Sequence, residues 1–145
     1  MEKVSYGQVA EIRHRVQAAF GELRKIGFIA RSNFSCCMSC ATYELSEIAE
    51  KKQRNRVAYW HHQDETRFKK DGALCIRYFY LPSKEIEGDT TSLETQTGEQ
   101  IAAALRKAGL NVDWNGNPDT IIEVTGVANQ HEPEKEVTNA TNATI

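Results

Sequence analysis

The segment that most constrains the fold is the apolar and aromatic run 73–81, ALCIRYFYL, which is followed by Pro82. Isoleucine, tyrosine and phenylalanine favour a β-strand, and a proline cannot donate the backbone hydrogen bond that a further sheet residue would make. We therefore expect residues 73–81 to form the strongest strand of the domain and to lie centrally in its sheet.

Periodic apolar residues predict helices before and after this strand. Over residues 9–26 they recur at spacings of three and four, and Gly27 follows as a C-cap glycine would. Asp64 and Thr97 are expected to cap two later helices, since both side chains accept hydrogen bonds from first-turn amides. The three further helices are expected over residues 39–50, 64–70 and 97–108.

Shorter strand-like segments complete the pattern, with a loop over residues 83–92. A turn cluster at 115–119 joins the last two strands into a hairpin. The resulting fold class is α+β: a mixed, mostly antiparallel sheet with helices on one face, a ferredoxin-like split β-α-β core, an N-terminal helix and a C-terminal hairpin. The shorter strands are expected over residues 28–34, 57–60, 110–114 and 120–124.

Length and composition favour one domain with one core. The chain has 145 residues, of which 40% are hydrophobic and 26% charged, as in ordinary single globular domains. Apolar residues become scarce after Val127. We therefore expect a single α+β domain over residues 1–127 and a flexible tail over 128–145.

The net charge and the spacing of the cysteines indicate the cellular location and the kinds of binding partner to expect. A net charge of -2 gives no long-range attraction for nucleic acid or a membrane surface. The start of the chain lacks the pattern of a signal peptide, and no apolar run reaches the roughly 20 residues that cross a bilayer. The crowded cysteines are unlike a secreted disulfide framework. We expect a cytoplasmic protein with reduced thiols, whose partner is a protein or a small ligand.

The chemical feature of the chain is the cysteine cluster at Cys36, Cys37 and Cys40, which follows the strand 28–34. His61 and His62 follow the next strand. In a split β-α-β core, two parallel strands flank a third and end at the same edge, about 10 Å apart at backbone level. The expected topology therefore allows the cysteines and the histidines to share one rim of the sheet.

A zinc site is the first functional hypothesis. Cys37 and Cys40 have the Cys-x-x-Cys spacing found in half of a zinc site, and Cys36 adds a third thiol. A histidine from the next strand end, His61 or His62, completes tetrahedral coordination. A helix beginning at the thiols favours their anionic, metal-binding form.

Two other interpretations use the same residues, and a third uses the surface. In a thiol enzyme, Cys37 attacks and Cys40 resolves, although no proline precedes the later strand as it does in thioredoxin-like enzymes. In a purely structural role, the cluster packs a tight corner and Cys75 fills the sheet. A non-enzymatic module instead binds a protein or ligand through aromatic and basic residues.

Three motifs resemble an uncharacterised bacterial family of unknown function. They are FSCCMSC at 34–40, YWHHQDE at 59–65, and AALRKAGL at 103–110 followed by DWNGNP at 113–118. Ala41 stands where the family pattern has glycine and His62 where it has glutamine, so His61 is the better candidate of the two histidines. The resemblance implies a shared fold but no known activity, and it singles out Cys36, Cys37, Cys40, His61, Gln63 and Asp64.

Overall fold

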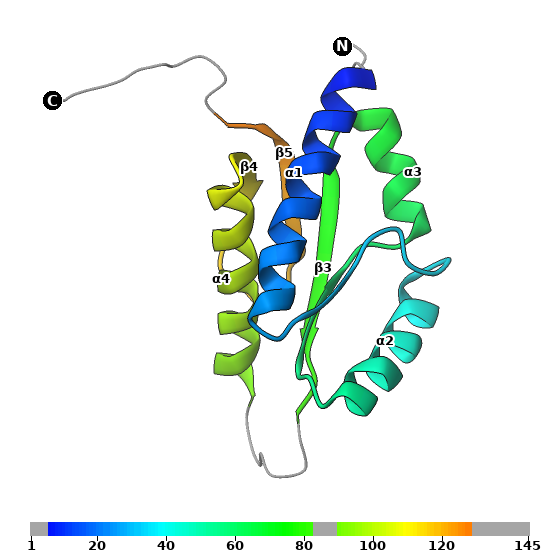
Figure 1. Ribbon diagram of the computed structural model, residues 1–145, viewed down its shortest axis with the longest axis vertical. Coiled ribbons are helices and arrows are strands. Elements are labelled where there is room, and N and C mark those ends of the chain that lie inside the picture. Colours follow the sequence, from blue (N-terminus) through cyan, green and yellow to red (C-terminus); the bar gives the residue numbers. More distant parts are fainter. Residues whose placement is uncertain (1–5, 83–89, 129–145) are drawn as a thin grey trace, which may run out of the picture.

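The computed structural model describes residues 6–82 and 90–128, in which helices and strands alternate (Figure 1). This confirms the α+β class. Most of the expected loop at 83–92 and nearly all of the expected tail at 128–145 lie outside these residues. The elements are α1 (Tyr6–Lys25), β1 (Ile29–Arg31), α2 (Met38–Lys52), β2 (Arg56–Tyr59), α3 (His62–Asp71), β3 (Leu74–Tyr80), α4 (Thr91–Lys107), β4 (Leu110–Asp113) and β5 (Ile122–Val127).

The strands form one five-stranded sheet in the order β1-β2-β3-β5-β4. β1 runs parallel to β2, whereas the β2-β3, β3-β5 and β4-β5 pairs are antiparallel. The sheet is thus mixed and mostly antiparallel, as expected, with β3 at its centre and β4-β5 as the C-terminal hairpin.

The prediction that a third strand separates the first two strands is wrong. β1 and β2 are direct neighbours, with Ala30 opposite Ala58, and β3 pairs with the other edge of β2. A helical crossover such as α2 can join two parallel strands either as direct neighbours or with a third strand between them, so the order of the elements along the chain does not distinguish the two arrangements. The ends of the adjacent strands β1 and β2 are closer than the split arrangement predicts.

Helices cover both faces of the sheet, whereas we expected them on one face. The residues of β2 show why: Ala58 packs in the core beneath α1 and α4, while Val57 and Tyr59 pack in a second core beneath α2. A strand that is apolar on both sides needs cover on both sides. Figure 1 shows α1 and α4 side by side, with α2 set apart from them.

Helix α4 begins at Thr91, a full turn and more before the expected cap at Thr97. Thr97 is fully buried inside the helix, and its hydroxyl donates to the carbonyl oxygen of Leu93 at 2.7 Å. Threonine can cap a helix or bond back to the preceding turn, and here it does the second. No helix within residues 6–82 and 90–128 combines the length and apolarity required to cross a membrane.

Close packing at Gly98 predicts a destabilising substitution. A Cβ atom on Gly98 would lie 2.6 Å from Cζ2 of Trp114 and 3.2 Å from Cε2 of Tyr78. We expect Gly98→Ala to lower the free energy of unfolding by about 1–2 kcal/mol, because overpacking outweighs the helix propensity gained. Urea denaturation followed by circular dichroism measures the change.

Gly21 in α1 is the matched control, since nothing lies within 4 Å of a Cβ atom added there. Gly21→Ala should raise the free energy of unfolding by about 0.5–1 kcal/mol. Equal effects at the two glycines would contradict the packing described at Trp114.

Candidate functional site

The loop between β1 and α2, residues 32–37, carries Cys36 and Cys37 and is called the cysteine loop below. Two of its residues have a left-handed backbone conformation. Asn33 has φ 49° and Ser35 has φ 69°, which ends β1 at Arg31, earlier than the expected residue 34. A non-glycine residue at positive φ is uncommon and costs energy. The strand therefore turns sharply before Cys36 instead of running straight into the cluster.

Backbone hydrogen bonds fasten this loop to the segment that follows β2. The N–H of Phe34 donates to the carbonyl of Trp60 at 2.8 Å, and the N–H of His62 donates to the carbonyl of Ser35 at 2.9 Å. The loop before α2 and the start of α3 thus form one rim. The cysteine and histidine motifs meet there because β1 and β2 are adjacent parallel strands.

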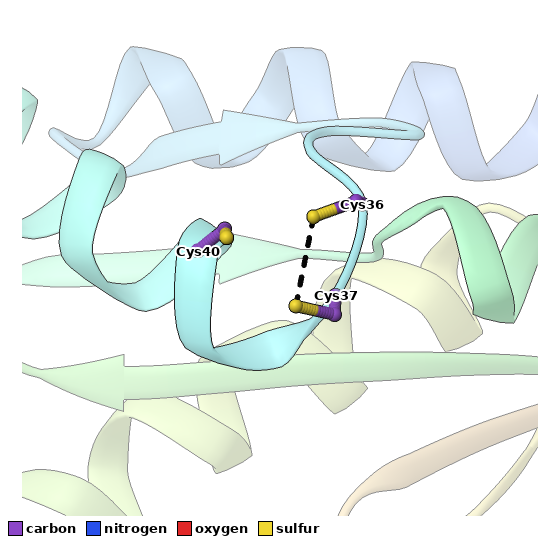
Figure 2. A group of neighbouring side chains, drawn as sticks. All are labelled: Cys36, Cys37 and Cys40. Carbon is purple, nitrogen blue, oxygen red and sulfur yellow. Dashed lines mark hydrogen bonds between the residues drawn. The ribbon is translucent and has the colours of Figure 1, made fainter.

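The three thiols of the cluster lie together. The Sγ atoms of Cys36, Cys37 and Cys40 are all within 4.8 Å of one another, and the first two are 3.6 Å apart. Figure 2 shows Cys36 and Cys37 on the loop and Cys40 on the first turn of α2. All three are free thiols, and Cys36 and Cys40 are exposed. The cluster can hold a metal ion.

The start of α2 sets the acidity of these thiols. Cys37 is the N-cap residue of α2, but its thiol makes no cap hydrogen bond of standard geometry. The backbone N–H of Cys40 and the neighbouring thiols nevertheless lower the pKa of Cys37. The hydrogen bonds of Cys40 to Cys36 and Cys37, with their charges, raise the pKa of Cys40 to about 11. Cys37 is therefore the thiol that ionises before Cys40.

His61 is the N-cap residue of α3, a place that we expected for Asp64. Its Nδ1 accepts from the backbone N–H of Asp64 at 3.3 Å, and the Asp64 carboxylate accepts from the N–H of His61 at 3.2 Å, which completes a capping box. Burial lowers the pKa of His61, so the ring is neutral at pH 7. His61 lies on the same rim but outside the group of three thiols.

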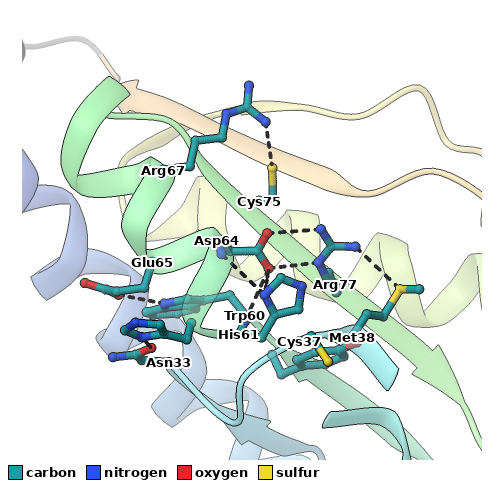
Figure 3. Close-up of polar contacts among 12 residues, drawn as sticks. Asn33, Cys37, Met38, Trp60, His61, Asp64, Glu65, Arg67, Cys75 and Arg77 are labelled. Carbon is teal, nitrogen blue, oxygen red and sulfur yellow. Dashed lines mark hydrogen bonds and ion pairs between the residues drawn. The ribbon is translucent and has the colours of Figure 1, made fainter. Parts of the chain in front are cut away.

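Arg77 connects the cap of α3 to the first residue of α2. Its Nε and Nη2 donate to the two carboxylate oxygens of Asp64, at 2.8 and 3.0 Å, while Nη1 contacts the Met38 sulfur at 3.6 Å (Figure 3). Asp64 is only 6% exposed. We did not predict Arg77 from the sequence, although a charged residue inside the most apolar strand was a signal that could have singled it out.

The remaining predicted residues are not brought to the cluster. Gln63 is exposed on α3. His62 is also exposed, with its Nδ1 3.4 Å from the side-chain oxygen of Asn33. Cys75 is buried in β3, as the structural interpretation expects, and its sulfur lies 3.8 Å from Nη1 of Arg67.

A second buried carboxylate, which we did not predict, anchors α3 to the core. Glu65 accepts two hydrogen bonds from Arg13 of α1, at 2.8 and 2.5 Å, and one from Nε1 of Trp60 at 2.9 Å. Burial alone would raise the pKa of Glu65, but the hydrogen bonds from Arg13 and Trp60 outweigh it, and the net pKa is lowered. This network fixes α3, and with it the position of His61.

Comparison with known proteins places the chain in a family without assigning it an activity. No curated protein and no solved structure matches it. The model of one family, described as Domain of unknown function (DUF6891), matches residues 5–131, and this range includes the cysteine cluster and the capping box of α3. The chain therefore belongs to the DUF6891 family, a domain family of unknown function.

Proposed function

We propose that this domain binds a zinc ion through the thiolates of Cys36, Cys37 and Cys40, with His61 as the fourth ligand. The observation that carries the proposal is the gathering of three sulfur atoms within 4.8 Å of one another. Thiolates are the ligands that zinc and other soft or borderline metals prefer.

The sulfur spacing suits a tetrahedral centre. With Zn–S bonds of about 2.3 Å, two thiolates of a tetrahedral site lie about 3.8 Å apart. Cys36 and Cys37 are already 3.6 Å apart as thiols. The lowered pKa of Cys37, caused first by the Cys40 N–H, favours the anion that a metal requires.

The surroundings of His61 support a role as ligand. Its Nδ1 lies 3.4 Å from Oδ2 of Asp64 as well as 3.3 Å from the Asp64 amide. These two contacts require different tautomers, since Nδ1 accepts from the amide but donates to the carboxylate. Histidines that bind metal commonly donate their other ring N–H to a carboxylate. Zinc bound at Nε2 would therefore favour the tautomer in which Nδ1 donates to the Asp64 carboxylate. Arg77 holds that carboxylate in place.

Metal content in three purified proteins tests the proposal. Native protein and Cys75→Ser should each hold about one zinc per chain by elemental analysis, and Cys37→Ser should hold almost none. Cys75 is the matched control because it is buried in β3, outside the group of thiols. A zinc-free native protein, after purification without chelator and titration with zinc, would rule out the proposal.

His61→Asn separates the ligand from the helix cap. Asparagine is a good N-cap residue, so this variant keeps the start of α3 while removing the imidazole. We expect it to bind zinc at least about tenfold more weakly than native protein, in competition with a chromogenic chelator. Unchanged affinity would exclude His61 and leave only the thiolates as protein ligands.

Thiol-disulfide exchange is a second candidate, favoured by the position of Cys37 at the start of α2 beside Cys40. The Cys37 thiolate would attack a substrate disulfide, which forms a mixed disulfide and releases one substrate thiol. Cys40 would then displace the second thiol and leave a Cys37–Cys40 disulfide, so that the substrate is reduced by two electrons and the protein is oxidised by two. A metal-free protein whose Cys37 reacts rapidly with a disulfide reagent at neutral pH would favour this activity.

A further inference from the structure

A pocket of about 350 Å³ lies beside the cysteine loop, on the face of the sheet that α2 covers only in part. Its walls come from the start of α2, from β2 and β3, and from the turn that precedes β5. Met38, between the cysteines of the cluster, belongs to this wall. The volume is in the range that holds a small organic molecule.

Arg77 lines this pocket, and one nitrogen of its guanidinium group has only a weak hydrogen-bond acceptor in the part of the chain that the structure describes. Asp64 occupies its Nε and Nη2, whereas Nη1 meets only the thioether of Met38 within the described residues, at 3.6 Å. A thioether sulfur is a weak acceptor. Met38 and Arg77 both line the pocket, and the Arg77 side chain is 26% exposed. A ligand oxygen can therefore reach Nη1 and replace the weak contact.

Two hydroxyl groups in the same wall are also weakly paired. The oxygen atoms of Tyr59 and Thr42 lie 3.5 Å apart, at the outer limit of a hydrogen bond. Both residues line the pocket. The Tyr59 hydroxyl can therefore donate to a bound oxygen. A cation and a hydroxyl donor facing one cavity suit an anion.

The other walls select the kind of anion. Phe79 and Ile121 supply apolar surface, which suits a flat apolar body. Asp119, exposed at the edge of the pocket, carries a negative charge that opposes a multiply charged group such as phosphate. We propose that this pocket binds a small organic monocarboxylate with a flat apolar body, its carboxylate held by Nη1 of Arg77 and the hydroxyl of Tyr59. The binding goes beyond the zinc proposal and does not depend on it.

Benzoate is the probe, with benzamide as the uncharged analogue of the same shape, and NMR titration of labelled protein measures both. Benzoate should shift the signals of pocket residues and bind at least about fivefold more tightly than benzamide, because only benzoate carries the charge that Arg77 recognises. Equal binding of the two probes would overturn the proposal, as would competition by inorganic phosphate at the same concentration.

Two substitutions at exposed positions should act in opposite directions without disturbing the core. Thr42→Trp fills the pocket and should weaken benzoate binding at least about tenfold, while Asp119→Asn removes a repulsive charge and should strengthen it about two- to fivefold. Thr66→Trp, at an exposed threonine of α3 outside the pocket, is the control and should change nothing. Loss of binding in the control, or no loss in Thr42→Trp, contradicts the proposal.

A metal-free measurement separates this inference from the proposed zinc site. Cys37→Ser, treated with chelator, should bind benzoate as native protein does, since none of the described residues that line the pocket is a cysteine. Loss of benzoate binding in this variant would show that the probe binds a metal, and it would overturn the proposal that the pocket binds a carboxylate. Failure of the zinc proposal alone would leave the binding of benzoate unchanged.

Discussion

Asp64→Ala should lower the free energy of unfolding by about 3 kcal/mol at neutral pH. Asp64 is 6% exposed, pairs with two nitrogens of Arg77 and closes the capping box with the N–H of His61. Removing one member of a largely buried ion pair leaves the other charge without its partner, which costs several kcal/mol, and the lost cap hydrogen bond adds to this. Urea denaturation of native protein and variant measures the difference.

Asp71 provides the matched control in the same helix. It pairs with Arg67 at 3.4 Å, and both side chains are about half exposed. Exposed pairs of this kind contribute little, so Asp71→Ala should change the free energy of unfolding by no more than about 0.5 kcal/mol. Similar losses in the two variants would show that Asp64 has no special structural role.

Glu65→Gln should lower the free energy of unfolding by about 2 kcal/mol at neutral pH. The carboxylate receives two hydrogen bonds from Arg13 and one from the buried Trp60 indole. A neutral amide cannot form the paired, charge-assisted contact with Arg13, and its NH₂ group meets donors where the carboxylate oxygens accepted. The buried position of Glu65, 4% exposed, prevents water from replacing these contacts.

The cost of Glu65→Gln should depend on pH, with a sign fixed by the lowered pKa of Glu65. Burial opposes ionisation, but the Arg13 and Trp60 hydrogen bonds prevail and lower the pKa from its ordinary 4.5. The carboxylate thus stabilises the fold fully above pH 4.5 and loses this effect as pH falls through the folded-state value. The gap in stability between native protein and Glu65→Gln should therefore narrow below pH 4.5.

Chemical denaturation at several pH values from 7 downward checks this result. Glu47→Gln is the control, because Glu47 is exposed on α2. Its difference from native protein should stay small and constant with pH. A Glu65→Gln gap that widens in acid would contradict the assigned direction of the pKa.

Much of the fold could be predicted from local patterns. The apolar spacing of residues 9–26 gave α1, Gly27 marked its end with φ 101°, and the run 73–81 gave the central strand β3. The ends of helices were harder to predict where one side chain can make either of two local hydrogen bonds. Thr97 looked like a cap but bonds back inside α4, and the sequence does not choose between these arrangements because both satisfy the hydroxyl.

The candidate site was predictable only in part. Cys36, Cys37 and Cys40 are near in sequence, so a turn into a helix brings their thiols together whatever the remaining topology. Asp64 was predicted as a helix cap, but its main partner, Arg77, lies on strand β3. That pair forms only because β3 runs beside β2, and no local pattern contains this information.

The sequence by itself determined the element types, the place of the cysteine cluster between a strand and a helix, and the family of the chain, because these depend on neighbouring residues. Only the tertiary structure decided that β1 and β2 are adjacent, that helices cover both faces, and that Arg77 joins the α3 cap to the start of α2. Contacts between distant segments depend on strand order, which is set by the packing of the whole core rather than by the local spacing of apolar residues.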